Sequence, residues 1–161
     1  MRLTLHTDYS LRVLMYVAVK GDALSTIKEI AEIFAISKAH LMKVVNRLAQ
    51  KGYLESVRGK KGGVRLARKS GQINVGAVVR DMEEELGVLG CLRGSGYCRI
   101  EACCTLRRAL SDATDAFMAV LDRLTLADLV KPRRPLAALL RIEPALAERP
   151  RRLNPRRAAR A

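Results

Sequence analysis

Residues 26–67, TIKEIAEIFAISKAHLMKVVNRLAQKGYLESVRGKKGGVRLA, contain the pattern from which the architecture of this chain follows. Apolar residues recur there at offsets 0, 3, 4 and 7 in two successive runs, the spacing of an amphipathic helix. The runs are Ile27, Ile30, Ala31 and Phe34, followed by Leu41, Val44, Val45 and Leu48. Thr26 with Glu29 forms a capping-box pattern, Ser37 is placed to cap the second helix, and Gly52 to end it. The pattern predicts a helix-turn-helix.

The segment after this pair, YLESVRGKKGGVRLA, predicts two strands around a turn rich in glycine and basic residues. Glycines let the backbone approach a phosphate closely, and the basic side chains neutralise it. The predicted fold is therefore mainly α with a small β wing, a winged helix-turn-helix over residues 1–70. A wing of this kind lies along or in the minor groove of DNA.

The second helix of the motif has a polar face opposite its apolar stripe. In a helix-turn-helix this helix enters the major groove, where Asn46 could pair with adenine and Lys43 or Arg47 with guanine or phosphate. We therefore predict that the chain binds double-stranded DNA. The predicted contacts are Ser37, Lys38, Ala39, His40, Lys43, Asn46 and Arg47 from the helix, with Arg58, Lys60 and Lys61 from the wing.

The charge distribution supports the same partner. The net charge is +14, but residues 131–161 carry ten basic residues against two acids, which accounts for +8. The more informative cluster is Lys38–Lys69, where ten basic residues face one acid, Glu55, so that 32 residues carry +9. A basic cluster inside a patterned segment is typical of nucleic-acid binding.

The remainder of the chain divides into four parts. A helix capped by Thr7 or Asp8 runs to about Lys20 and belongs to residues 1–70. Residues 71–104 contain a short helix over about residues 75–86 and the cysteine loop, which we expect to bind a metal cluster. Over residues 105–130 the apolar positions repeat every 3.5 residues, which predicts a dimerisation helix. All five prolines lie beyond residue 131, so residues 131–161 are expected to be a basic and mostly disordered tail, with a short apolar turn at 136–142.

Four cysteines fall within fourteen residues, as Cys91, Cys98, Cys103 and Cys104. No apolar run approaches the roughly 20 residues that span a bilayer, and no cleavable leader is evident, so we expect a cytoplasmic protein without a membrane partner. Thiols stay reduced in that compartment. Thiolates clustered in a loop are typical ligands of zinc or of iron–sulfur clusters, and the wide spacing favours the larger cluster.

The order of TDYSLR, RGKKGGVRL, the cysteine loop and TLADLV resembles the iron–sulfur winged-helix repressors of the Rrf-two family, in particular its nitric-oxide-sensing members, over about residues 1–130. The resemblance implies a homodimeric repressor that binds a palindromic operator and releases nitric-oxide detoxification genes on exposure to nitric oxide. It implies an iron–sulfur cluster, [4Fe-4S] with [2Fe-2S] as the alternative. The implied ligands are Cys91, Cys98 and Cys104, with Asp8 of the partner subunit as the fourth.

Several alternatives stay open at this stage. Cys103 could replace Cys104 as a ligand, and Asp8 could be no more than a helix cap. The signal could be iron or redox state within the same family, or the thiols could sense oxidants without a cluster. The basic tail could belong to a general packaging protein. We find no nucleophile–base pair, carboxylate pair or phosphate-binding glycine loop, so an enzyme is not expected.

Overall fold

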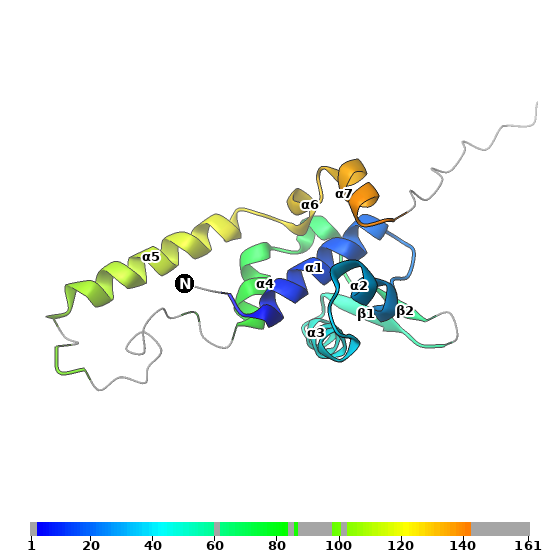
Figure 1. The fold of residues 1–161 in the computed structure, drawn as a ribbon. Helices are drawn as coiled ribbons and strands as arrows, with labels where there is room; N and C mark the ends of the chain where they lie inside the picture. The colour runs from blue at the N-terminus through cyan, green and yellow to red at the C-terminus, as the bar shows by residue number, and fades with distance from the viewer. Residues whose placement is uncertain (1–2, 60–61, 84–85, 87–97, 101–102, 143–161) are drawn as a thin grey trace, which may run out of the picture.

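A computed structural model describes residues 3–59, 62–83, 86, 98–100 and 103–142 of the 161-residue chain (Figure 1). Over these residues it is mainly helical with one small sheet. The elements in chain order are α1 (Leu5–Lys20), α2 (Ile27–Phe34), α3 (Lys38–Gln50), β1 (Leu54–Val57), β2 (Gly63–Leu66), the 3-10 helix η1 (Ser70–Gln72), α4 (Val75–Met82), α5 (Thr105–Asp122), α6 (Leu126–Leu129) and α7 (Arg133–Leu139). No helix among the described residues combines the length and apolar character needed to cross a bilayer.

The helix-turn-helix forms where its local signals predict it. Thr26 and Glu29 make the reciprocal capping box of α2, and the Ser37 hydroxyl accepts a hydrogen bond from the His40 amide at the start of α3. Ala35 turns the chain between the helices in the left-handed conformation, with φ of 52°. Gly52, with φ of 71°, follows Lys51, the C-cap of α3, as expected for a glycine that ends a helix. These predictions are confirmed.

The wing is an antiparallel hairpin in which Leu54 pairs with Leu66 and Val57 with Gly63. Its turn needs glycine at two positions. Gly59 has φ of 122°, a conformation that other L-residues rarely adopt. A Cβ on Gly62 would lie 2.4 Å from the Val57 carbonyl oxygen, so no larger residue fits there without moving the backbone. The two predicted strands and the glycine positions of the turn are confirmed, while Lys60 and Lys61 lie outside the described residues.

The core forms around α1, which contacts α3, α4, β2, α6 and α7. Val13, Leu14 and Val17 on this helix are completely buried, and Leu41 and Leu48 meet them from α3. Full burial of one such aliphatic side chain is worth about 1.5–3 kcal/mol relative to exposure. A single apolar cluster therefore fixes the recognition helix α3 and the wing against α1.

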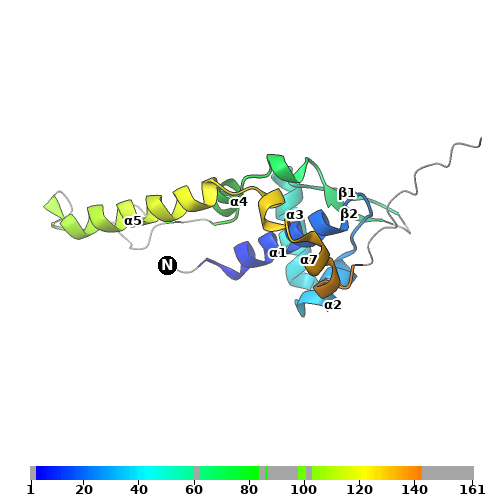
Figure 2. The same cartoon turned by 90° about the horizontal axis from the view of Figure 1, so that it is seen from above.

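The helix α5 extends away from this body as a long rod (Figures 1 and 2). Of its 18 residues only Met118 is buried. Its near end contacts α4, while large apolar side chains such as Leu106 and Val120 remain 61% and 58% exposed. The long helix predicted from the 3.5-residue repeat is present, and the described residues leave much of its apolar stripe uncovered.

Two helix ends differ from the sequence predictions. The cap of α1 is Thr4, whose hydroxyl accepts from the Thr7 amide, while Thr7 itself is buried inside the helix; capping by Thr7 or Asp8 is therefore wrong. The helix expected over about residues 75–86 ends earlier, because Glu83 leaves the helical conformation with ψ of 133°.

The C-terminal part of the described chain also differs. The rod ends at Asp122 instead of continuing to residue 130, because Thr125 and Asp128 form a second capping box that starts α6. Beyond residue 131, where we expected irregular chain, α7 spans Arg133–Leu139 and Leu140 and Ile142 pack against the core. The short apolar turn predicted at residues 136–142 thus belongs to a helix that contacts α1.

Candidate nucleic-acid interface and cluster ligands

The outward face of α3 is exposed as predicted. Val44 and Leu48 point into the core, and the opposite face carries the predicted contacts Lys38, Ala39, His40, Lys43, Asn46 and Arg47, all exposed. Ser37 is exposed too, but its hydroxyl oxygen already accepts the His40 amide hydrogen. Its structural role is thus that of a cap, which leaves the helix N-terminus oriented toward solvent. The geometry is that of a helix that could enter a major groove.

Sequence reasoning missed Met42. This side chain is 53% exposed on α3, at the margin of the outward face. Its position 100° from the buried Leu41 is the signal that could have identified it, since a residue at that angle lies outside the stripe. An exposed apolar side chain beside polar ones suits the methyl group of thymine, the apolar group that the major groove presents.

The basic segment 38–69 separates into two kinds of residue. Arg58 is exposed on the wing, while Lys60 and Lys61 lie outside the described residues. Other bases serve the fold: Arg65 pairs with Glu55, and Arg68 donates to the carbonyl oxygens of residues 51 and 52 and lies 4.8 Å from the centre of the Tyr53 ring. The +9 of the sequence therefore overstates the charge available to a polyanion, and the outward bases of α3 and the wing are the relevant ones.

A carboxylate connects α4 to the wing side of the body. Asp81 accepts hydrogen bonds from Lys51 Nζ and from the Tyr53 hydroxyl, each at 2.7 Å. Partial burial acts to raise the pKa of Asp81, but these two bonds, with the charges of Lys51 and Arg47, lower it overall. Burial and the bond to Asp81 raise the pKa of Tyr53 above its ordinary value. The ionised Asp81 thus ties the end of α3 and the start of the wing to α4.

The described cysteines lie at and before the start of α5. Cys104 is the N-cap of this helix, half-buried, and its Sγ accepts a hydrogen bond from the Arg107 amide at 3.4 Å. Cys98 and Cys103 are exposed, and Cys103 Sγ donates to the Ile100 carbonyl oxygen at 3.6 Å. Cys91 lies outside the described residues. Within the described residues no three potential ligands come together as a metal site. Of the described cysteines, Cys104 is the one whose sulfur lies at a helix N-terminus and accepts a backbone amide hydrogen.

Asp8 lies in the first turns of α1 with its side chain 42% exposed. Its carboxylate pairs with Arg12 one turn later, at 2.9 Å, and the Arg12 guanidinium lies 5.9 Å from the centre of the Phe34 ring at the end of α2. The structure therefore places Asp8 at the surface and gives it a partner on its own helix. It does not act as the cap of that helix.

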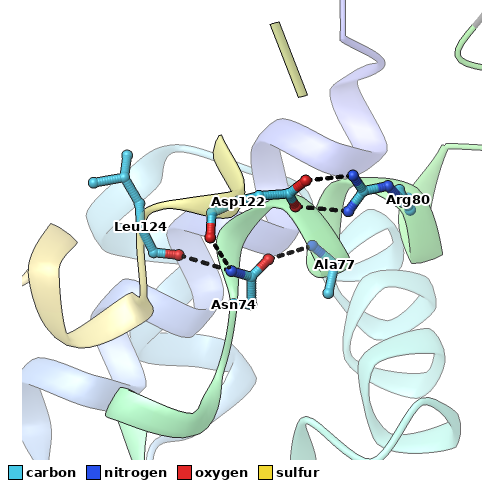
Figure 3. Close-up of polar contacts among 5 residues, drawn as sticks. All are labelled: Asn74, Ala77, Arg80, Asp122 and Leu124. Atoms are coloured by element: carbon cyan, nitrogen blue, oxygen red, sulfur yellow. Dashed lines mark hydrogen bonds and ion pairs between the residues drawn. The ribbon is translucent and has the colours of Figure 1, made fainter. Parts of the chain in front are cut away.

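A polar cluster, which we call the α4–α5 joint, fixes the base of the rod (Figure 3). Its polar members are Asn74, Arg80 and Asp122, and Gly76, which the figure does not label, lies against Asp122. Both guanidinium NH2 groups of Arg80 donate to the Asp122 carboxylate, at 2.7 and 2.6 Å, and this pairing holds the pKa of Asp122 below its usual range. The Asn74 side-chain amide donates to the Asp122 carbonyl oxygen at 2.6 Å and caps α4 through Ala77. A Cβ on Gly76 would lie 2.0 Å from Asp122 Oδ1. Sequence analysis did not identify this joint.

Comparison with known proteins places this architecture. The family model of Rrf2, described as an iron-dependent transcriptional regulator, matches residues 3–132. The chain belongs to the Rrf2 family. It is 46% identical over 145 residues to the HTH-type transcriptional regulator NsrR of Bacillus subtilis, covering 89% of this chain and 99% of that protein. The NsrR protein of Geobacillus kaustophilus is 45% identical over 143 residues, covering 88% and 97%.

Solved structures of Rrf2-like regulators share the fold. The cysteine regulator CymR of B. subtilis aligns with a TM-score of 0.65 at 26% identity, over 82% of this chain and 98% of that one. IscR of T. potens aligns with a TM-score of 0.66 at 26% identity, over 82% and 88%. The predicted winged helix and the resemblance to NsrR-type regulators are thereby confirmed. The chain is a transcriptional regulator and not an enzyme.

Proposed function

We propose that this chain is a homodimeric DNA-binding repressor whose iron–sulfur cluster makes operator binding sensitive to nitric oxide. The observation that carries the proposal is the combination of an outward-facing basic α3 with Cys104 at the start of the rod α5 and Cys98 six residues before it, in a chain 46% identical to an NsrR regulator. In this assignment residues 1–70 bind DNA, residues 71–104 hold the cluster, residues 105–130 mediate dimerisation, and residues 131–161 form a basic appendage.

The uncovered stripe of α5 supports the dimer. One narrow arc of α5 holds Leu106, Leu110, Ala113, Phe117 and Val120, and the buried Met118 lies outside that arc. A helix that leaves such side chains in water is stabilised by a second copy laid along it. Two copies of α3 would then enter successive major grooves of a palindromic operator.

The residues that would hold the cluster are Cys91, Cys98 and Cys104, with Asp8 of the partner subunit as the fourth ligand. The cluster, [4Fe-4S] or [2Fe-2S], would supply iron with which nitric oxide reacts. Cys104 fits the role of ligand better than Cys103, because its sulfur lies at the helix N-terminus and receives an amide hydrogen. A carboxylate is an exchangeable iron ligand, and Asp8 has Arg12 available on its own helix whenever it is not bound elsewhere.

The test is anaerobic purification with visible absorbance and counts of iron and sulfide, followed by nitric oxide titration against DNA retention on an operator selected from random duplexes. C104S is expected to lose the cluster, whereas the neighbouring control C103S keeps it. A colourless protein whose DNA binding ignores nitric oxide would end this proposal.

Two other outcomes would indicate that the chain responds to a signal other than nitric oxide. If the cluster is present but iron depletion alone releases DNA, the chain is an iron-responsive member of its family. If no cluster forms and mild oxidation yields an intramolecular disulfide, seen by mass spectrometry, that changes DNA binding, the thiols themselves sense oxidants.

A further inference from the structure

A small pocket opens between the N-terminal half of α1 and the recognition helix α3. Its volume is about 180 Å³, and it is lined by Leu5, His6, Tyr9, His40, Lys43 and Val44. The Tyr9 and His40 rings stand 6.4 Å apart between centroids and are tilted by 39°. Both histidines of the chain thus line this pocket, and only His40 and Lys43 were anticipated as DNA contacts.

The lining combines two chemistries in one place. Leu5, 57% exposed, and the buried Val44 provide an apolar surface. Lys43 is a cation, and the imidazole and phenol rings of His6, Tyr9 and His40 supply hydrogen-bond donors. None of the six lining residues is acidic. A deoxyribose with its phosphate needs this pairing, since the sugar carbons prefer apolar contact and the phosphate oxygens accept from neutral donors and cations.

The position of the pocket matches a strand of the duplex. A helix with its side chains is about 10–12 Å across, and the major groove is about 12 Å wide, so an inserted helix has a sugar–phosphate backbone along each flank. Lys43 belongs both to the outward face of α3 and to the pocket. The pocket is therefore continuous with the proposed interface on the flank that faces α1.

We propose that this pocket receives one sugar–phosphate unit of the DNA backbone, with His6 and Tyr9 of α1 as contacts additional to those of α3. The proposal rests on the proposed function, because it requires α3 to lie in the major groove. It predicts a contact that strengthens binding to every sequence and contributes to the salt dependence of binding.

The test introduces a carboxylate into the pocket and compares it with the same charge elsewhere. In H6E the new side chain repels phosphate, while its place in the first turn of α1 suits an acidic residue and leaves the fold intact. The control Q72E adds the same charge at an exposed position outside the pocket. Binding to a nonspecific duplex of about 30 base pairs, long enough for two half-sites, is measured by anisotropy at several salt concentrations.

H6E is expected to weaken binding about tenfold more than Q72E and to lower the salt slope by about one. Y9F, which keeps the ring and removes one donor to the anionic phosphate, is expected to weaken binding about tenfold, the lower end of the range for one hydrogen bond to a charged group. Equal affinities for H6E and Q72E, with wild-type protein that binds DNA, would overturn the pocket proposal alone. Wild-type protein that binds neither nonspecific DNA nor any selected operator would overturn the proposed function.

Discussion

The helices α1 and α5 both carry many apolar side chains, but they lie in opposite environments. Seven of the 16 residues of α1 are buried, and the helix is surrounded by α3, α4, β2, α6 and α7. One of the 18 residues of α5 is buried, and among the described residues its apolar stripe is exposed or half-buried. An apolar face on a helix therefore indicates that something packs against it. The pattern does not indicate whether the packing partner belongs to the same chain or to a second copy. In this molecule the winged-helix body completes its own core, whereas the apolar stripe of α5 is left largely uncovered by the described residues, and we propose that a second copy covers it.

The largest effect is expected when the exposed apolar stripe of α5 is made polar, because this removes the surface that we propose to form the dimer interface. The double variant L106E/V120E is expected to be monomeric, because two carboxylates would have to be buried in the seam. Loss of the second half-site contact should weaken operator binding by about 100-fold or more. Sedimentation velocity and operator titration measure the two effects.

Ala119 provides the matched control for this variant. It is exposed on α5 and lies on the side of the helix opposite the stripe. A119E is expected to remain dimeric and to bind the operator normally. If L106E/V120E keeps the wild-type sedimentation coefficient, the stripe is not the dimer seam.

The next effect concerns the joint through which the two regions meet. Because a Cβ at position 76 would lie 2.0 Å from Asp122 Oδ1, G76A must displace a carboxylate that Arg80 holds from both nitrogens. Such overpacking is expected to lower the free energy of unfolding by about 1–3 kcal/mol. Thermal unfolding measures it against G71A, whose added methyl would meet nothing within 4 Å. Equal melting temperatures for the two variants would mean that Asp122 moves aside without a loss of stability.

A smaller effect tests whether the basic residues of the wing contact DNA while those near α7 do not. Neutralising Lys60 and Lys61 to Gln is expected to weaken binding to all sequences and to lower the salt slope by about two. The control removes two charges at Lys131 and Arg134, beside and on α7, which lies across α1 from α3 (Figure 1). A slope that changes equally in both variants would remove the wing from the interface.

The smallest effect is the pH dependence of the body itself. The pKa of Asp81 is lowered in the folded state, so its stabilising contribution is complete above the ordinary carboxyl value of about 4 and is lost as the pH falls through the folded value. Between about pH 5 and pH 3 the wild type should therefore lose more stability than D81N. The difference is expected to stay below about 1 kcal/mol, because a third of the Asp81 side chain is exposed.

Urea unfolding at each pH measures this difference. The control is D112N, an exposed position on α5. A steeper acid loss in D81N than in the wild type would contradict the sign of the assigned pKa change.

Sequence signals predicted those parts of the fold that are determined within a few residues. The capping box of Thr26 and Glu29 and the Ser37 cap act over three residues, so the helix-turn-helix could be predicted closely. The Thr4 cap could not, because it is stabilised by Glu83, which accepts from the Thr4 amide and lies 79 residues away in the chain. The break after Asp122 was detectable in principle, since Thr125 and Asp128 have the spacing of a capping box.

The candidate sites also divide into those that local sequence predicts and those that depend on contacts between distant segments. The outward face of α3 follows from helical periodicity alone, and Cys104 could be assigned by its resemblance to a family pattern. The α4–α5 joint and the pocket between α1 and α3 depend on which helices meet in space. Asn74 is 48 residues from Asp122, and Tyr9 is 31 positions from His40, so no local pattern indicates either contact.

The close approach of Gly76 to Asp122 limits how far α5 can tilt relative to α4. With 18 residues at 1.5 Å per residue, α5 is about 27 Å long. A tilt of about 10° at its base would displace its far end by about 5 Å, roughly the rise of three residues of helix. In the proposed dimer that displacement changes the separation of two recognition helices that must match half-sites one turn of DNA apart, about 34 Å. Glycine at position 76 thus helps to set the tilt of α5. In the proposed dimer, a changed tilt would shift the two recognition helices relative to the base pairs of their half-sites.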